Sequence, residues 1–177
     1  MMAKTIKDAF PNLPKDDGDL VAVSDELWKL GNLDEIQEKV NPELFIVHVG
    51  MNVIGNFQSD GWHSIFMYQR KLLPFISKAL NELGLHEVET SFQKVLSLFP
   101  ELLCNADEAK SLNFLNGAYW EYSEKELKQF SKEERAKIAD YNKVIKELDD
   151  VSDTFLLQTP NDGWESVMNY ISKKYDI

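Results

Sequence analysis

The stretch that decides the fold covers residues 41–54 and reads NPELFIVHVGMNVI. Asn41 and Pro42 are typical of a helix start, because an Asn side chain accepts hydrogen bonds from free helix N–H groups and Pro fits the first turn. The residues from Leu44 to Ile54 are apolar on nearly every side. Since a helix that is apolar all round is a buried one, this segment is predicted to lie at the centre of the core.

Apolar side chains recur at three- and four-residue steps on both sides of this segment, which predicts further helices. Gly84 and Pro100 are expected to end two of them, whereas residues 56–61 are expected to form a loop. No segment alternates with a period of two for long enough to predict a strand. The helices are expected at residues 20–30, 33–40, 44–54, 62–68, 71–83, 86–99, 106–115, 132–148 and 164–175.

The predicted architecture is therefore all-α. It is a single-domain bundle of about seven to nine helices over residues 20–177, preceded by an irregular arm at residues 1–19. The pairs Ser123 with Glu126 and Ser131 with Glu134 have the spacing of capping boxes, so helices are expected to begin there. A chain of 177 residues can bury a core without help from disulfides or metals.

The cysteine content and the apolar segments of the sequence indicate the cellular compartment of the protein. Cys104 is the only cysteine and follows two leucines, so it is expected to be a small core residue, and an intrachain disulfide is excluded. This usage is typical of a reducing compartment, and we expect a cytoplasmic protein. The first residues do not have the pattern of a signal peptide, and no apolar run is long enough for a transmembrane helix.

The formal net charge of −11 restricts the partners. Nucleic acid and anionic membranes would repel this chain, so a basic protein or a cation is the expected partner. The other interpretation is that the acidity only serves solubility. The charge is uneven along the chain, since residues 1–65 carry −6, residues 66–100 carry +1 and residues 101–177 carry −6.

Local pairing divides the acidic residues into two groups. Between Glu121 and Asp150 most acids have a base four residues away, for example Lys143 with Glu147, which predicts a self-paired helix surface. Carboxylates three or four residues apart on a helix lie about 5–6 Å apart, near the spacing of phosphates along a strand. The acids with less local pairing are the predicted partner-binding residues: Asp16, Asp17, Asp19, Glu26, Asp34, Glu38, Asp149, Asp153, Asp162 and Glu165.

Motifs of catalysis are not found in the sequence. The three histidines form no HExxH pair, and neither a G-x-S-x-G elbow nor a phosphate-binding loop occurs. The run of acids at residues 16–19 departs from the ligand spacing of a calcium loop. We therefore predict a protein without catalytic residues, metal or cofactor, and a hydrolase using clustered carboxylates is the weakest alternative.

One sequence frame occurs twice. Residues 60–68 and 162–170 share the pattern D-G-W-x-S-apolar-apolar-x-Y. The pattern predicts a turn, a capped helix start and a Trp that anchors the helix to the core. The alternative is that Trp62 and Trp164 belong to two related packing or binding elements.

The first copy also resembles a family signature. Residues 59–66, SDGWHSIF, are similar to the N-G-G-F-x-Q-F-F signature of a bacterial family of acidic helical proteins, the DNA-mimic-protein type. Further similarity lies in residues 79–85, in Phe99-Pro100 and in three short C-terminal pieces (Leu148-Asp149, Phe155 and Tyr170-Ile171), so that it covers about residues 20–175. Ser59, Asp60 and Ser64 depart from the signature. The structural positions assigned to the resemblance are Asp60, which replaces a glycine of the signature, and Gly61, Trp62, Phe66 and Gly84.

The resemblance implies an all-α fold and a homodimer. For some members of the family it also implies that the acidic face occupies the DNA-binding surface of a regulator. The leading hypothesis is therefore a non-catalytic acidic interaction protein, of the DNA-mimic type, that binds a basic DNA-binding regulator. The alternative is a helical immunity or toxin-neutralising module whose acidity serves solubility.

Overall fold

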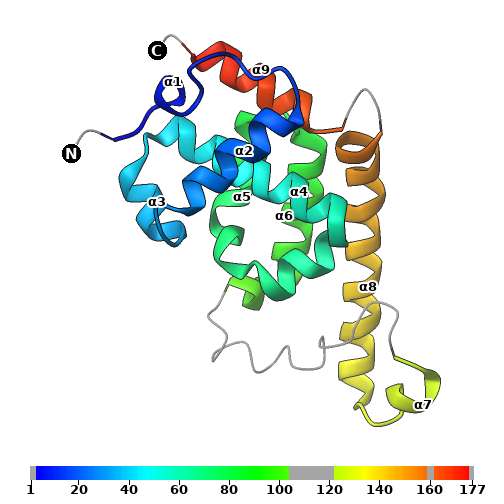
Figure 1. The fold of residues 1–177 in the computed structure, drawn as a ribbon. Helices are drawn as coiled ribbons and strands as arrows, with labels where there is room; N and C mark the ends of the chain where they lie inside the picture. Colours follow the sequence, from blue (N-terminus) through cyan, green and yellow to red (C-terminus); the bar gives the residue numbers. More distant parts are fainter. Residues whose placement is uncertain (1–2, 104–121, 159–161, 176–177) are drawn as a thin grey trace.

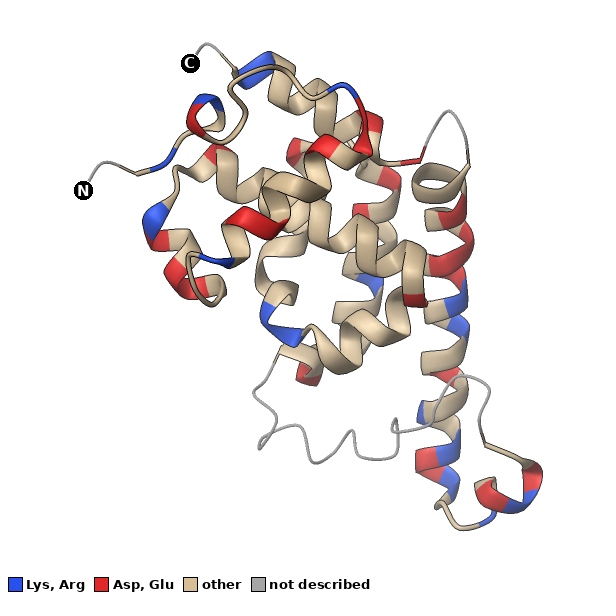
Figure 2. Ribbon diagram, in the orientation of Figure 1, with Lys and Arg blue, Asp and Glu red and all other residues tan. Residues whose placement is uncertain are grey.

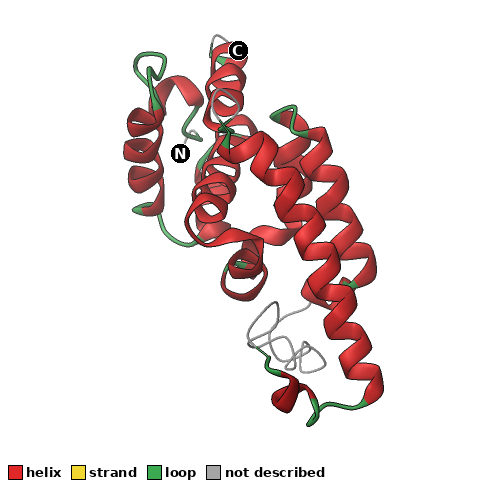
Figure 3. Cartoon of the chain, turned by 90° about the vertical axis from the view of Figure 1, so that its right-hand side faces the viewer, coloured by secondary structure: helices red, strands yellow, loops and turns green. Residues whose placement is uncertain are grey.

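The computed structural model describes residues 3–103, 122–158 and 162–175. The predicted all-α class is confirmed, because the described residues form helices and no strands (Figures 1 and 3). The helices are α1 (Ile6–Ala9), α2 (Asp17–Trp28), α3 (Leu33–Lys39), α4 (Pro42–Tyr68), α5 (Leu73–Glu82), α6 (His86–Leu98), α7 (Glu124–Leu127), α8 (Lys132–Ser152) and α9 (Trp164–Lys174). The predicted helix at residues 106–115 and the core position of Cys104 lie outside the described residues.

Helix α4 is the centre of the molecule, as its sequence predicts. Asn41 caps it by accepting the N–H of Leu44 at 2.9 Å, and Pro42 occupies its first turn. Every residue from Leu44 to Met51 is buried. Helices α2, α5, α8 and α9 all pack against α4, which makes it the shared wall of the core (Figure 1).

The predicted loop at residues 56–61 is wrong. The helix continues through it, and only Gly61 leaves helical geometry, with φ 72° and ψ 177°. Two long-range contacts hold the polar stretch helical, because the side-chain amide of Gln58 donates to the carbonyls of Leu156 and Asp162 at 2.6 and 2.9 Å. Gly61 therefore makes a kink inside one long helix, where a separate helix was predicted to begin.

The predicted irregular arm contains a short helix and part of the core. Thr5 and Asp8 form a capping box that begins α1, and Ile6 and Phe10 are buried. A short parallel bridge ties the chain here, since the N–H of Lys4 donates to the carbonyl of Lys39 at 2.8 Å. The apolar residues of the arm thus extend the core beyond the predicted boundary at residue 20.

The C-terminal half adds a second layer, in which α8 packs along α6 (Figure 3). Ser131 and Glu134 form the predicted capping box of α8, and Ser123 and Glu126 form that of α7. Helix α8 runs to Ser152, four residues beyond its predicted end, and continues into a π-helical turn, η4 (Asp153–Leu157). Gly84 ends α5 with φ 78°, as predicted.

The two D-G-W frames are two Trp-anchored helix segments. Gly61 and Gly163 both have positive φ, and the tryptophan after each is buried. The indole N–H of Trp62 donates to the Ser152 hydroxyl at 2.7 Å, and that of Trp164 donates to the Gln58 side chain at 3.0 Å. The predicted Trp anchor is present in both copies, whereas the predicted turn before a new helix is present only in the second, because α4 continues through the first.

Trp62 also lies at the centre of an aromatic cluster in the core. Its ring lies 5.4 Å from Phe92 of α6 and 5.9 Å from Phe66, and Phe66 stacks on Phe92 at 5.8 Å. All three rings are fully buried. The signature positions Trp62 and Phe66 are therefore interior packing residues. No helix in the described part of the chain has the length and apolar character needed to span a membrane.

Candidate functional site

Helix α8 carries opposite charges at its two ends. Residues 132–146 contain five basic and three acidic residues, whereas residues 147–165 contain six acidic residues and no Lys or Arg. Acids near a helix C-terminus oppose the helix dipole, each at a cost of about 0.3–1 kcal/mol. The last turn of α8 has no basic residue to offset them. Helix stability therefore does not explain this acidic end, which makes it a candidate for binding.

Several predicted binding acids have structural partners. Asp16 accepts the N–H of Asp19 at 3.1 Å, and Asp19 accepts the N–H of Lys15 at 2.9 Å, so both shape the start of α2. Asp162 caps α9 by accepting the N–H of Trp164 at 3.1 Å. These carboxylates contribute charge at the surface, but their first role is local folding.

Two further predicted acids are also engaged. Glu26 forms an ion pair with Lys29, and this pair lowers the pKa of the carboxyl group. Asp149 faces the kink of α4 and accepts the N–H of Trp62 at 3.4 Å. Both are parts of the folded framework as well as of the acidic surface.

The remaining predicted acids, Asp17, Asp34, Glu38, Asp153 and Glu165, are exposed. The structure does not bring them all to one face. Helix α3, which carries Asp34 and Glu38, lies on the side of the molecule opposite to α8 (Figure 2). The ten predicted residues therefore do not form a single row of carboxylates.

The prediction that the acids of α8 pair with bases on the same helix is only partly confirmed. Lys146 binds Asp150 four residues on, at 2.7 Å, which confirms one pair. Glu147 forms its ion pair with Lys94 of α6, while Lys143, the predicted partner, interacts with it only through a weaker charge attraction. The sequence distance favours the local partner, but the packing of α6 along α8 brings the other lysine closer.

A groove between α2 and α4 is the best-defined acidic site. It has a volume of about 320 Å³, and Trp164 of α9 is among its lining residues. Its side chains include Asp25 and Trp28 from α2 and Asn52 and Asp60 from α4. No Lys or Arg among the described residues forms an ion pair with Asp25 or Asp60. We call this site the α2–α4 groove.

Trp28 lines this groove, and two contacts hold its side chain in place. Its indole N–H donates to Asn52 at 3.2 Å, and its ring meets the edge of His48 at 4.8 Å. Asn52 in turn donates to the backbone carbonyl of His48 at 2.8 Å. Yet Trp28 stays 39% exposed. An immobilised and partly exposed tryptophan is a typical anchor for a binding partner.

His48 supports the Trp28 ring from inside the core and does not line the groove itself. The side chain is fully buried in α4, and this burial lowers the pKa of the imidazole to about 4. It is therefore uncharged at neutral pH, as expected for a core histidine. The charges at the groove are the two rim carboxylates, Asp25 and Asp60, so the groove favours a cation.

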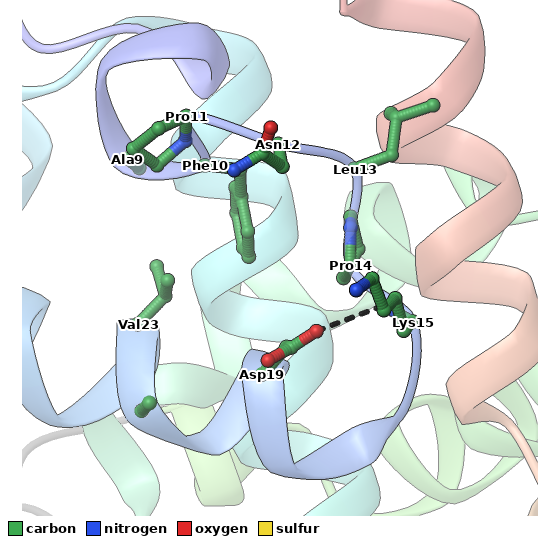
Figure 4. Close-up of a pocket in the computed structure, with 10 residues that line it drawn as sticks. Ala9, Phe10, Pro11, Asn12, Leu13, Pro14, Lys15, Asp19 and Val23 are labelled. Carbon is green, nitrogen blue, oxygen red and sulfur yellow. Dashed lines mark hydrogen bonds between the residues drawn. The ribbon is translucent and has the colours of Figure 1, made fainter.

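A larger cavity of about 560 Å³ lies under the loop that joins α1 to α2 (Figure 4). Phe10 points toward it and Leu13 points away from it, while the N–H of Lys15 donates to Asp19 across one end. Lys15 and Asp19 are its only titratable side chains. The lining offers no nucleophile beside a base, so the cavity lacks the arrangement that nucleophilic catalysis requires.

The described ranges of the chain also lack a cluster of metal-binding type. They contain no group of three or more His, Cys, Asp or Glu side chains that could hold a metal ion. His63 shares a hydrogen bond with Tyr141 at 2.9 Å, and His86 shares one with Asn81 at 3.0 Å. These histidines contribute contacts between side chains of the fold.

Comparisons with protein-family models, with curated proteins and with solved structures found no match. The resemblance of residues 59–66 to the DNA-mimic-protein signature therefore remains a prediction. The α2–α4 groove and the charge of the surface around it are the features of the structure that bear on function.

Two residues of the groove were not predicted. Trp28 and Asp25 lie on α2 beside the apolar face of Leu20 and Leu27. The available signal was a tryptophan next to two acids on a helix whose inward face was already assigned. Asp60 was predicted only as a structural signature position, and the structure leaves its side chain exposed at the groove.

Proposed function

We propose that this protein is a non-catalytic interaction protein whose acidic surface binds a basic protein, such as a DNA-binding regulator. The observation that carries the proposal is the α2–α4 groove, which is lined by the carboxylates of Asp25 and Asp60 and by the partly exposed ring of Trp28. Lys and Arg side chains of a partner suit such a site. Their charge pairs with Asp25 and Asp60, and their cationic group attracts the indole ring.

The surroundings of the groove support the same partner. The N–H of Trp62, one residue beyond the kink at Gly61, donates to Asp149, so the acidic end of α8 lies next to Asp60. The carboxylates of Asp149, Asp150 and Asp153 all act on Lys146, which places them in one electrostatic neighbourhood. A basic partner would be attracted at a distance by this field and held at the groove.

If the protein is a DNA mimic, its partner cannot bind DNA while it is bound to this protein. The resemblance supports DNA mimicry, as do the acids of α2, of which there are five in residues 16–28 without any Lys or Arg. The basic first half of α8 lies outside this surface. We therefore place the partner over α2, the kink of α4 and the end of α8.

Titration against basic DNA-binding regulators from the same genome tests the proposal, at about 50, 150 and 400 mM NaCl. The double variant D25N/D60N should bind at least about tenfold more weakly. The matched control is E133Q/D140N, which removes the same charge from the exposed, basic half of α8 and should bind like the wild type. Affinity that does not change with salt would contradict the proposal.

Competition separates the two leading hypotheses. If the protein is a DNA mimic, duplex DNA should displace it from the regulator, and the protein should displace DNA. A complex that forms at the groove while the partner keeps its DNA, or with a partner that never binds DNA, would favour the helical neutralising module instead.

A further inference from the structure

A second pocket lies on the other side of Trp28 and has the opposite charge. It has a volume of about 290 Å³, and its lining includes Trp28, Asn32, Tyr68, Arg70 and Lys71. Arg70 and Lys71 belong to the turn η1 (Arg70–Leu72) between α4 and α5, the basic turn coloured blue between these helices in Figure 2. We call it the Arg70 pocket.

Arg70 is in an unusual position for a cation. Its Nε atom is buried and has no hydrogen-bond partner. No carboxylate among the described residues forms an ion pair with Arg70 or Lys71. An unsatisfied buried donor costs about 1–3 kcal/mol, and more when it is charged, so most such groups in proteins have a partner. In a chain with 30 acids and 19 bases, two neighbouring cations without an ion pair to an acid form a local site that suits an anion.

The amide of Asn32 adds a further donor. Its oxygen accepts the N–H groups of Asp34 and Glu35 at 3.1 and 3.2 Å, because Asn32 is the cap of α3. This fixes the orientation of the amide and leaves its NH₂ group as the polar end available to a ligand. The nearby Glu35 carboxylate is already engaged by the backbone N–H of Asn32 at 2.7 Å. The polar atoms offered by the pocket are therefore mainly donors, which suits an anion.

The other walls are aromatic and apolar. Tyr68 is 80% exposed and Trp28 is 39% exposed, and the buried side chains of Leu33 and Leu72 lie behind them. Exposed aromatic faces beside cationic donors bind flat rings that carry a phosphate. The overall charge of the protein opposes such a ligand only weakly here, because charges beyond about 8 Å are screened at physiological salt.

We propose that the Arg70 pocket binds a nucleoside monophosphate, with its phosphate at Arg70 and Lys71 and its base against Trp28 or Tyr68. Arg70 supplies a fork of N–H donors that matches phosphate oxygens, and Lys71 adds a second positive charge. The pocket shares Trp28 with the α2–α4 groove, but its cations belong to a different segment, so this inference does not depend on the proposed function.

The test is a titration of the ¹⁵N-labelled full chain with adenosine monophosphate, followed by NMR. We expect the Nε–H signal of Arg70 to shift on binding, because the same guanidinium group takes up the phosphate. Calorimetry in parallel should show that R70Q and K71Q each weaken binding at least about tenfold. The control K78Q removes an exposed lysine of α5 that does not line the pocket and should bind normally.

Two further ligands check the two parts of the site. Inorganic phosphate alone and adenosine alone should each bind at least about tenfold more weakly than the whole nucleotide. The proposal is overturned if the Arg70 signal does not move at saturation, if R70Q and K71Q both bind like the wild type, or if phosphate alone binds as tightly as the nucleotide. The direct NMR readout on the wild-type protein remains decisive if R70Q fails to fold.

Discussion

The indole N–H of Trp62 donates a hydrogen bond of 2.7 Å to the hydroxyl of Ser152, and both side chains are fully buried. Ninety residues separate them in the sequence. The bond joins the kinked half of α4 to the end of α8, the two elements that border the acidic surface. The position of that surface therefore depends on a polar contact inside the core.

Replacing Ser152 with Ala should destabilise the protein by about 1–3 kcal/mol, because the indole N–H would stay buried without an acceptor. Urea unfolding measures the change. The control is Ser97→Ala on α6, where an exposed hydroxyl returns to the carbonyl of Gln93 and its loss should cost less than about 0.5 kcal/mol. Equal losses of unfolding free energy in the two variants would show that the buried hydrogen bond stabilises the protein no more than the exposed one.

Replacing Gly61 with Ala should destabilise the protein by about 1–3 kcal/mol, since its backbone lies in a region that only glycine occupies freely. Gly55 is the matched control in the same helix. Its backbone is helical, and an added methyl group would meet the Trp164 ring at an ordinary 3.7 Å. Gly55→Ala should therefore stabilise by about 0.5–1 kcal/mol. Thermal and urea unfolding of both variants would settle the sign of each change.

Much of the fold follows from local sequence, and the exceptions are long-range. Asn41-Pro42 and the apolar run from Leu44 predict the buried helix because caps and periodicity act between near neighbours. The stretch before Gly61 is polar and looks like a loop. It stays helical because Gln58 reaches the carbonyls of Leu156 and Asp162, about a hundred residues away. No local pattern contains that information.

The candidate site was harder to predict for the same reason. The acidic excess is visible in the sequence, but the packing of the helices decides which acid pairs with which base. Glu147, for example, forms its ion pair with Lys94 of another helix and not with Lys143 four residues away. Trp28 is held at the groove by Asn52, 24 residues on, which accepts its indole N–H. The sequence therefore predicts the kind of surface, whereas the structure is needed to find the groove.

Stability should fall as the pH drops below about 6.5, through His48. Burial holds the pKa of its imidazole at about 4, below the ordinary 6.5, so the unfolded chain binds a proton that the folded chain excludes. The contribution is fully present above pH 6.5, and about 2 kcal/mol of it should be lost by pH 5. Unfolding in urea at several pH values measures this loss, and an NMR titration of His48 gives its pKa directly.

The variant His48→Gln isolates this effect. It should flatten the stability profile between pH 7 and 5, because the remaining loss then comes from carboxylates such as Glu147, whose pKa its ion pair with Lys94 lowers. Identical slopes in the variant and the wild type, or an NMR pKa near 6.5, would show that His48 does not control the acid sensitivity.

The acidic end of α8 should lower stability while it serves binding. Asp153→Asn removes a negative charge from the end of the helix and should raise the free energy of unfolding by about 0.3–1 kcal/mol at low salt. Glu133→Gln is the matched control, because the same change in the first turn of α8 removes a favourable charge and should lower it by a similar amount. Both effects should fade in about 1 M NaCl.

If the proposed function is right, only Asp153→Asn should weaken the binding of a basic partner. A stabilised variant that binds as well as the wild type would mean that the charge at Asp153 serves neither folding nor this interaction.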